Sequence, residues 1–320
     1  MQIENATKND CVYIVFIYNK NEVIFIMNYV SLIVDLKKSR TYKVSNRIEI
    51  QEFLVDCTDI LNMVFAAEIE FSVTFSAGDE LQGLFKNVTA AYLYFRLLSM
   101  LVHPVQIRAG IGVGEWTIKI EQGTSTQQDG PAYHKARQAI EEVYKMQLQN
   151  IRICADEDDI LGNYFINASN ALKIQQISKQ HMVWVIMEFL YPFMSEGMHK
   201  RKISYLMEVL LERKFEYQFR RETGYSNKYT SRNNISWYND WELNLDNFEI
   251  VDPIDIDGIL VEPESKILKR NISSVISELL GCSRQNVDGL IRRGNSNKIR
   301  ELDYVALQYL ERKYGKDRWD

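Results

Sequence analysis

Two kinds of hydrophobic pattern follow one another along the first half of the chain. Short apolar runs alternate with longer stretches in which apolar residues recur every three or four positions. The first pattern is typical of buried strands and the second of amphipathic helices. Their order predicts an α/β fold with one sheet, one hairpin and helices packed mainly on one face. The expected strands cover residues 29–35, 70–76, 81–85, 105–113 and 150–154, and the expected helices cover residues 47–65, 88–101 and 129–144.

The second half of the chain has a mainly helical pattern. Apolar periodicity predicts helices over residues 170–193 and 202–214. Residues 215–265 are rich in Asn, Tyr, Trp and Asp and lack a period, so we expect an irregular or β-rich insertion there. The predicted parts are a domain over 27–155 that ends before an acidic run, a helical connector over 156–265 and a C-terminal segment over 266–320, with residues 1–26 either an upstream extension or an extra edge strand.

Composition narrows the kinds of partner that the protein can have. The 320 residues are 46% hydrophobic, which is enough for a substantial core. A formal net charge of −5 excludes an overall electrostatic attraction to nucleic acid or anionic membranes, so any DNA contact has to come from a local patch. The four cysteines form no CxxC pair, which favours a reducing cytoplasm over a disulfide framework. The sequence contains no uninterrupted run of about 20 apolar residues, so it predicts no membrane span.

Two aspartates lie where expected strands end. Asp35 closes the first strand, and Asp79 lies at the tip of the hairpin, where Gly78 supplies the positive φ that a two-residue turn requires. If these strands are antiparallel neighbours, the two carboxylates converge at one rim of the sheet. Carboxylates together with substrate phosphates bind Mg²⁺ or Mn²⁺, so Asp35 and Asp79 are the candidate metal ligands. The alternative is ordinary turn chemistry at Asp79 and helix capping at Asp35.

Several residues near this pair suit phosphate binding. Ser39 and Arg40 closely follow the first strand, and an arginine presents a fork of donors that matches phosphate oxygens. Arg108 is a further candidate, although an arginine on a strand is also commonly a solvated or locally paired charge. The candidate nucleotide-binding residues are Ser39, Arg40, Gly78 and Arg108.

Glycines occupy alternate positions of the expected strand 105–113. Gly110, Gly112 and Gly114 therefore share one face of that strand. A glycine inside a strand usually marks the close approach of a ligand or of another backbone. The sequence leaves open whether a ligand or a packed helix crosses these glycines.

Four segments in order resemble the successive motifs of the SatD family. The resemblance covers residues 27–150 closely and the helical remainder loosely, and four ordered motifs are far more specific than one. SatD proteins are bacterial and mostly of unassigned activity. The segments are VDLKKSR (34–40), VTFSAGDELQGLF (73–85), IRAGIGVGE (107–115) and DGPAYHKAR (129–137).

The motif order is also similar, more distantly, to the palm-like core of class III nucleotidyl cyclases and GGDEF domains. This resemblance implies an α+β, ferredoxin-like sheet in which Asp35 and Asp79 hold the metals. It places the phosphate-contacting arginine of the cyclases at Arg137, which makes Arg137 a candidate catalytic residue. Tyr133 stands where those cyclases have an asparagine and is the second candidate, while Phe75 replaces their base-reading lysine.

The C-terminal segment over residues 271–294 has the layout of a helix-turn-helix. Ser273 or Ser274 can begin the first helix, Gly281 makes the turn, and Ser283 caps a second helix with an apolar face. The alternative is a helix pair used for packing or dimerisation. The second helix would present side chains that read base edges or bind phosphates, namely Arg284, Gln285, Asn286, Arg292 and Arg293.

Two functions fit these features. The first is a domain that binds a nucleoside triphosphate with Mg²⁺ or Mn²⁺, acts as a cyclase-like nucleotidyltransferase or as a sensor, and is coupled to a helix-turn-helix that contacts duplex DNA. The cyclase resemblance implies a homodimer, because class III cyclase sites form between two subunits. The alternative is a DNA-binding transcriptional regulator whose palm-like domain is an inactive scaffold.

Overall fold

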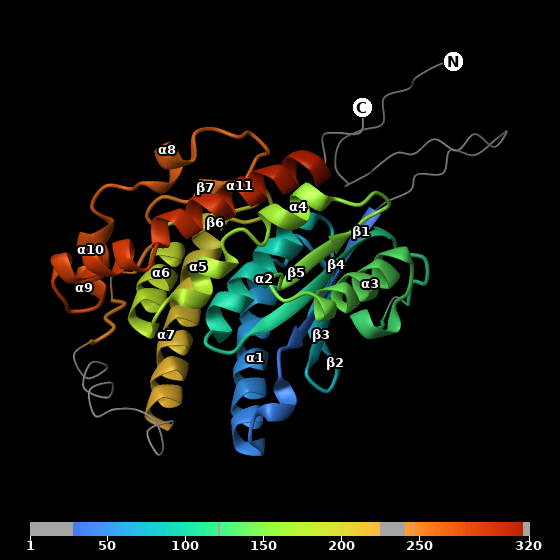
Figure 1. The fold of residues 1–320 in the computed structure, drawn as a ribbon, viewed down its shortest axis with the longest axis horizontal. Helices are drawn as coiled ribbons and strands as arrows, with labels where there is room; N and C mark the ends of the chain where they lie inside the picture. Colours follow the sequence, from blue (N-terminus) through green and yellow to red (C-terminus); the bar gives the residue numbers. More distant parts are fainter. Residues whose placement is uncertain (1–27, 121, 225–240, 247, 316–320) are drawn as a thin grey trace.

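A computed structural model describes residues 28–120, 122–224, 241–246 and 248–315. Within these residues a five-stranded mixed sheet lies beside a large helical part (Figure 1). The expected extension or edge strand over residues 1–26 lies outside the described residues. The described part contains no helix long and apolar enough to cross a membrane.

The sheet has the strand order β2-β3-β1-β4-β5. Strand β1 is antiparallel to both β3 and β4, and β5 is parallel to β4. With α1 between β1 and β2 and α2 between β3 and β4, the order matches the β-α-β-β-α-β, ferredoxin-like arrangement. The predicted α+β, ferredoxin-like sheet is therefore confirmed. The strands are β1 (Asn28–Leu36), β2 (Ile69–Ala77), β3 (Glu80–Phe85), β4 (Ile107–Glu115) and β5 (Ile151–Cys154).

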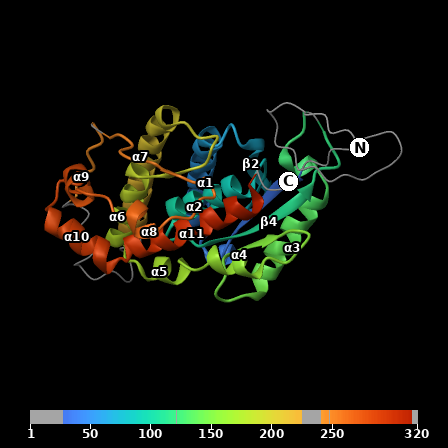
Figure 2. The ribbon, with the colours of Figure 1, turned by 90° about the horizontal axis from the view of Figure 1, so that it is seen from above.

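Helices cover both faces of the sheet. Figures 1 and 2 show α1 (Val44–Val64) and α2 (Val88–Val102) on one face and α3 (Pro131–Lys145) on the other. Successive side chains of a strand point to opposite faces, so Leu32 joins the main core while Ile33 packs against α3. The odd-numbered positions of β1 therefore face α3.

A helix, and not a ligand, crosses the glycines of β4. A Cβ added at Gly110 would lie 2.3 Å from the backbone oxygen of Ala136, and one at Gly112 would lie 2.1 Å from that of Ala132. These distances leave no room for a side chain, because α3 approaches the backbone of β4 directly. The glycine spacing thus fixes where α3 lies on the sheet.

The helical part differs from its expected form in two places. The single helix expected over 170–193 is two helices, because residue Gln176 is extended and its side chain donates to Gly294 O at 2.7 Å. The helix expected over 202–214 continues to Gly224. Its additional residues include Tyr217, whose ring stacks on that of Phe53 of α1 with 3.8 Å between the ring centroids. The elements are α4 (Ile160–Phe165), α5 (Asn170–Gln175), α6 (Ser178–Leu190), β6 (Phe193–Met194), α7 (Lys200–Gly224), β7 (Ile254–Asp255), α8 (Pro263–Ile267), α9 (Ile272–Leu279), α10 (Arg284–Arg293) and α11 (Ser296–Tyr314).

One hydrophobic core extends from β1 to α11. Buried ion pairs cross it: Arg96 on α2 bonds Glu188 on α6 at 2.7 Å and Asp303 on α11 at 2.6 Å. Arg300 on α11 also pairs with Glu188. The palm-like sheet and the helical part are thereby joined through both apolar and ionic contacts.

Candidate functional site

Asp35 and Asp79 lie close together at one rim of the sheet. Asp35 is the last but one residue of β1 and stands opposite Glu80 of β3 in the sheet register. Gly78 has φ +63° and, with Asp79, forms the two-residue connection between β2 and β3. Burial raises the pKa of Asp35 above its ordinary value, and the nearby charge of Asp79 raises it further. The convergence of the two carboxylates is the geometry expected from the strand order.

Asp79 carries an oxygen that lacks a partner. Its Oδ2 atom is buried and accepts no hydrogen bond from any of the described residues. Leaving a buried carboxylate oxygen unpaired costs on the order of 1–3 kcal/mol, so such an atom needs a physical explanation. A cation at the rim would supply one.

Arg108 neutralises Asp35. Its Nε and Nη2 atoms both lie 2.8 Å from Asp35 Oδ2, and the Asp35 side chain is 13% exposed. The guanidinium also lies over the ring of Tyr144, with 3.6 Å between its carbon and the ring centroid. The Arg108 contact opposes the rise in the pKa of Asp35 that burial causes. Because Oδ2 is occupied by Arg108, a cation would bind Asp35 through its other oxygen.

Arg137 is held by Glu80. Its two terminal nitrogens lie 2.5 and 2.7 Å from the two carboxylate oxygens, which is a bidentate pair. The hydrogen bonds to Glu80 raise the pKa of Arg137. Glu80 also accepts a hydrogen bond from Ser76 Oγ at 2.9 Å. Because Glu80 stands opposite Asp35 in the register, α3 brings Arg137 to the same rim as the aspartates.

Tyr133, one turn before Arg137 on α3, has a different environment. It is buried in a small cluster with Tyr29 and Leu84. Its hydroxyl lies 3.5 Å from Ser125 Oγ, and burial raises its pKa to about 12. The phenol is therefore protonated at neutral pH, and its contacts are those of a packed side chain.

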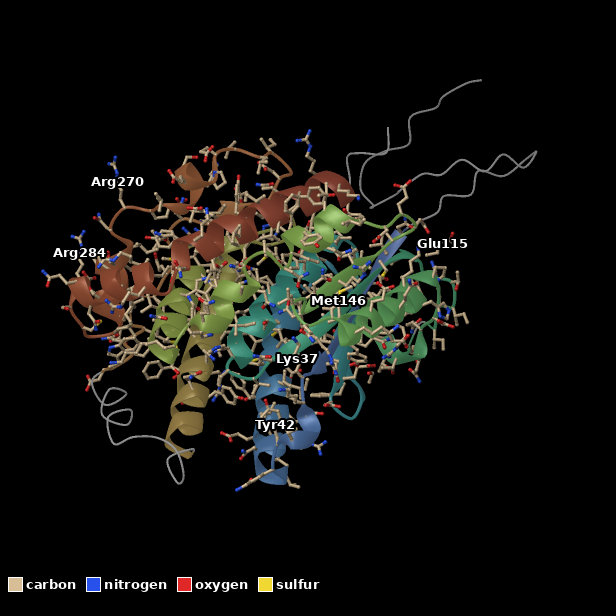
Figure 3. The ribbon with its side chains drawn as sticks, in the orientation of Figure 1. Lys37, Tyr42, Glu115, Met146, Arg270 and Arg284 are labelled. Atoms are coloured by element: carbon tan, nitrogen blue, oxygen red, sulfur yellow. The ribbon has the colours of Figure 1, made fainter. Side chains whose placement is uncertain are left out.

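The loop after β1 is basic. Ser39 lies in a short 3-10 helix, Ser39–Thr41, and is half-buried, whereas the side chain of Arg40 lies outside the described part of the chain. Figure 3 shows Lys37 close to the end of β1. Burial, together with the neighbouring charge of Arg108, lowers the pKa of Lys37. The sequence of this loop, KKSRTYK (37–43), contains basic residues and no acid.

The rim suits a cation that shares its coordination with a ligand. Among the described residues no three histidine, cysteine, aspartate or glutamate side chains gather into a metal-binding group. Two carboxylates with one unpaired oxygen instead fit Mg²⁺ or Mn²⁺, which keep water and phosphate oxygens as their other ligands. Glu80 and Tyr144 are the site residues that the sequence did not indicate, since neither lies in a position that local pattern marks.

The predicted DNA-contacting side chains lie on α10, far from this rim. Gly281 has φ +59° in the turn after α9, and Ser283 Oγ caps α10 by accepting from Asn286 N. Figures 1 and 3 place α10 and Arg284 at one end of the molecule, well away from Lys37. Whether α9 and α10 act as a DNA-binding helix-turn-helix stays a prediction. All five predicted side chains are exposed: Arg284, Gln285, Asn286, Arg292 and Arg293.

The ferredoxin-like sheet, with its hairpin and glycine-rich strand, defines an α+β domain with an acidic rim. The model of the SatD family matches residues 29–214, which is more than half of the chain. The chain therefore belongs to the SatD family. No curated protein matches it.

Two solved structures, each described as a bacterial light-regulated adenylyl cyclase, are similar to part of this chain. In both comparisons the identity is 14%, the TM-score is 0.30 and the aligned part covers 40% of this chain. It covers 76% of one cyclase chain and 43% of the other.

Proposed function

We propose that this SatD-family protein binds a nucleoside triphosphate together with Mg²⁺ or Mn²⁺ at the rim formed by Asp35 and Asp79. The observation that carries the proposal is the unpaired, buried Oδ2 atom of Asp79 beside the part-buried Asp35. Two acids held this close repel each other, and a bound cation removes that repulsion. When bound, the metal would neutralise phosphate charge and stabilise a pyrophosphate leaving group.

The protein's own residues would bind and orient the triphosphate. Arg108 lies beside Asp35, and Arg137 approaches the rim from α3. Both guanidiniums are paired with carboxylates, so phosphate oxygens would compete with Glu80 for Arg137. With its side chain 45% exposed, Arg137 is the more accessible of the two. Ser39 and the basic residues of the loop after β1 would contact further phosphate oxygens.

Pyrophosphate release separates a nucleotidyltransferase from a sensor. We expect an enzyme to release pyrophosphate from a nucleoside triphosphate with Mn²⁺, and Asp79→Asn to abolish the release. A sensor binds the nucleotide in wild type, loses affinity in Asp79→Asn, and releases no pyrophosphate from either. The assay is a pyrophosphate measurement run beside a titration of nucleotide binding. Absence of both binding and release in wild type would overturn the proposal.

A second matched variant tests the role of Arg137. Arg137→Lys keeps the charge but loses the bidentate fork, so we expect at least about tenfold weaker nucleotide binding, or about 1.4 kcal/mol. Arg152, which pairs with Glu142 and Asp158 away from the rim, offers the control Arg152→Lys. An equal effect of both substitutions would contradict a phosphate contact at Arg137.

The alternative function is a DNA-binding regulator whose palm-like domain is an inactive scaffold. Two observations favour it: the exposed polar face of α10, and the packed environment of Tyr133. It predicts DNA binding that falls steeply with salt but ignores Mg²⁺ and nucleotide. Fluorescence anisotropy with duplex DNA tests this, with Arg293→Gln expected to weaken binding and Lys298→Gln on α11 as the control. Unchanged binding in Arg293→Gln would exclude this face.

We further propose that the protein is a cytoplasmic homodimer. The support is the similarity of the motifs to class III cyclases, whose sites form between two subunits. Light scattering after size exclusion measures the mass in solution, and a monomer at micromolar concentration with bound nucleotide would refute this part.

A further inference from the structure

A cavity that is partly open to solvent lies between α2, α5 and α6. Its volume is about 90 Å³, and the loop that joins α2 to β4 closes one side. A single water needs roughly 10–15 Å³ of such volume, so the cavity holds either several waters or one small organic molecule. It is separate from the rim of Asp35 and Asp79, neither of which lines it.

The lining of this cavity carries only positive charge. Lys37, Arg96 and Lys173 contribute to it, and no aspartate or glutamate does among the described residues. Apolar and aromatic side chains such as Phe95 and Ile174 form much of the remaining surface. A cavity of this kind favours a ligand with one anionic group and a partly apolar body.

The buried ion pairs behind the lining have an excess of positive charge. Three cations take part, Arg96, Lys173 and Arg300. Two carboxylates oppose them, Glu188 and Asp303. Three positive and two negative charges leave one positive charge, and burial is the main cause that lowers the pKa of Lys173. An anion in the cavity would balance the excess and favour the charged form of Lys173.

Three ring nitrogens of lining residues also lack partners among the described residues: His103 Nδ1, His181 Nδ1 and Trp184 Nε1. The His181 Nε2 atom lies 2.9 Å from Met100 O, so Nε2 donates and Nδ1 is left as an acceptor. Burial lowers the pKa of His103 to about 3, so its ring is neutral. His181 and Trp184 are each 2% exposed, and each unpaired group costs on the order of 1–3 kcal/mol.

We propose that this cavity is a binding site for a small organic anion, with one carboxylate or phosphate group directed at Lys173 and Arg96. The body of the ligand packs against the apolar lining, and Trp184 Nε1, an N–H donor without a partner among the described residues, donates to an oxygen of the anionic group. The site does not depend on nucleotide binding at the rim. It adjoins the rim in sequence, because Lys37 follows Asp35 by two residues and Ile107 precedes Arg108.

Calorimetric titration with benzoate and with phenyl phosphate tests the site and distinguishes the two anionic groups. We expect one of them to bind wild type at a single site and benzyl alcohol, the neutral control, to bind at least about tenfold more weakly. Lys173→Met should weaken binding of that anion at least about tenfold, which is about 1.4 kcal/mol. Asp79→Asn should leave it unchanged, which separates this site from the proposed nucleotide site.

Three results would overturn the proposal. They are no binding of either anion to wild type, equal binding of benzyl alcohol, and loss of anion binding in Asp79→Asn, which would place the anion at the rim. If Lys173→Met does not fold, Ser99→Phe fills the lining without removing an ion pair and should abolish binding. Full affinity in a folded Ser99→Phe variant would also overturn it.

Discussion

At the scale of single residues, Asp79 is placed unfavourably for folding. Its carboxylate lies near Asp35, and one of its oxygens is buried without a partner. A side chain selected for stability would be neutral here or would have a hydrogen-bond donor beside it. The unfavourable contact is therefore an indication of a ligand, since a cation bound between the two carboxylates would replace their repulsion by attraction to the cation.

Asp79→Asn should stabilise the protein in the absence of divalent cations. Asparagine keeps the turn preference and removes the like charge, so we expect the free energy of unfolding at pH 7 to rise by up to about 1 kcal/mol. The raised pKa of Asp35 means that stability falls as pH rises from the ordinary aspartate value through the folded one. The gain from Asp79→Asn should therefore shrink as the pH falls and Asp35 is protonated.

Urea unfolding with a chelator present measures this difference. Asp56→Asn is the control, because Asp56 is an exposed aspartate on α1. A loss of more than about 1 kcal/mol in Asp79→Asn alone would mean that Asp79 is a structural turn residue.

At the scale of elements, the position of α3 depends on the glycines of β4. The helix carries Arg137 to the rim only because Gly110 and Gly112 let its backbone approach the strand. Of the two alternatives that the sequence leaves open for this glycine stripe, a ligand or a packed helix, the structure shows the helix. The same docking aligns Arg137 with Glu80.

Gly112→Ala should displace α3 and destabilise the fold. The added Cβ would meet backbone atoms of α3 at 2.1 Å, and overpacking of this kind costs typically about 1–3 kcal/mol. Gly114→Ala is the matched control, because its nearest contact would be 3.1 Å and a small shift relieves it. Equal free energies of unfolding for the two variants would contradict close packing of α3 at Gly112.

The local sequence was sufficient to predict those elements that depend on interactions between residues close together in the chain. The apolar run ending at Asp35 and the Gly78 turn predicted β1 and the β2–β3 hairpin, because strand burial and positive φ act over a few residues. The Arg137 to Glu80 pair was not predictable, since its partners are 57 positions apart and meet only when α3 docks. The break after α5 likewise depends on a contact between Gln176 and Gly294, 118 positions away.

At the scale of the whole molecule, buried charges connect the sheet to the C-terminal helices. Glu188 of α6 accepts from Arg96 of α2 and from Arg300 of α11, and all three side chains are 1% exposed. Burial raises the pKa of Glu188, but the two guanidiniums lower it by more, so the pKa lies below its ordinary value. We therefore expect the α+β domain and the helical part to unfold together.

Glu188→Gln should destabilise both parts together. Removing one partner leaves buried cations uncompensated, which costs roughly 3–5 kcal/mol. The stability that Glu188 contributes in wild type is fully present above the ordinary glutamate pKa. It is lost as the pH falls through the lowered pKa of Glu188 in the folded protein. Urea unfolding followed by circular dichroism measures it, with Glu278→Gln on the exposed face of α9 as the control. A loss below about 1 kcal/mol would contradict the role of this charge.

Thermal unfolding with nucleotides tests the central claim most directly. Wild type and Asp79→Asn are heated with each nucleoside triphosphate, with Mn²⁺, Mg²⁺ or a chelator. A ligand at 100 times its dissociation constant adds about 2.7 kcal/mol to the native state. We predict a rise for wild type that requires both a triphosphate and the metal and that disappears in Asp79→Asn. No rise with any triphosphate, or an equal rise in the variant, would contradict a metal-nucleotide site at this rim.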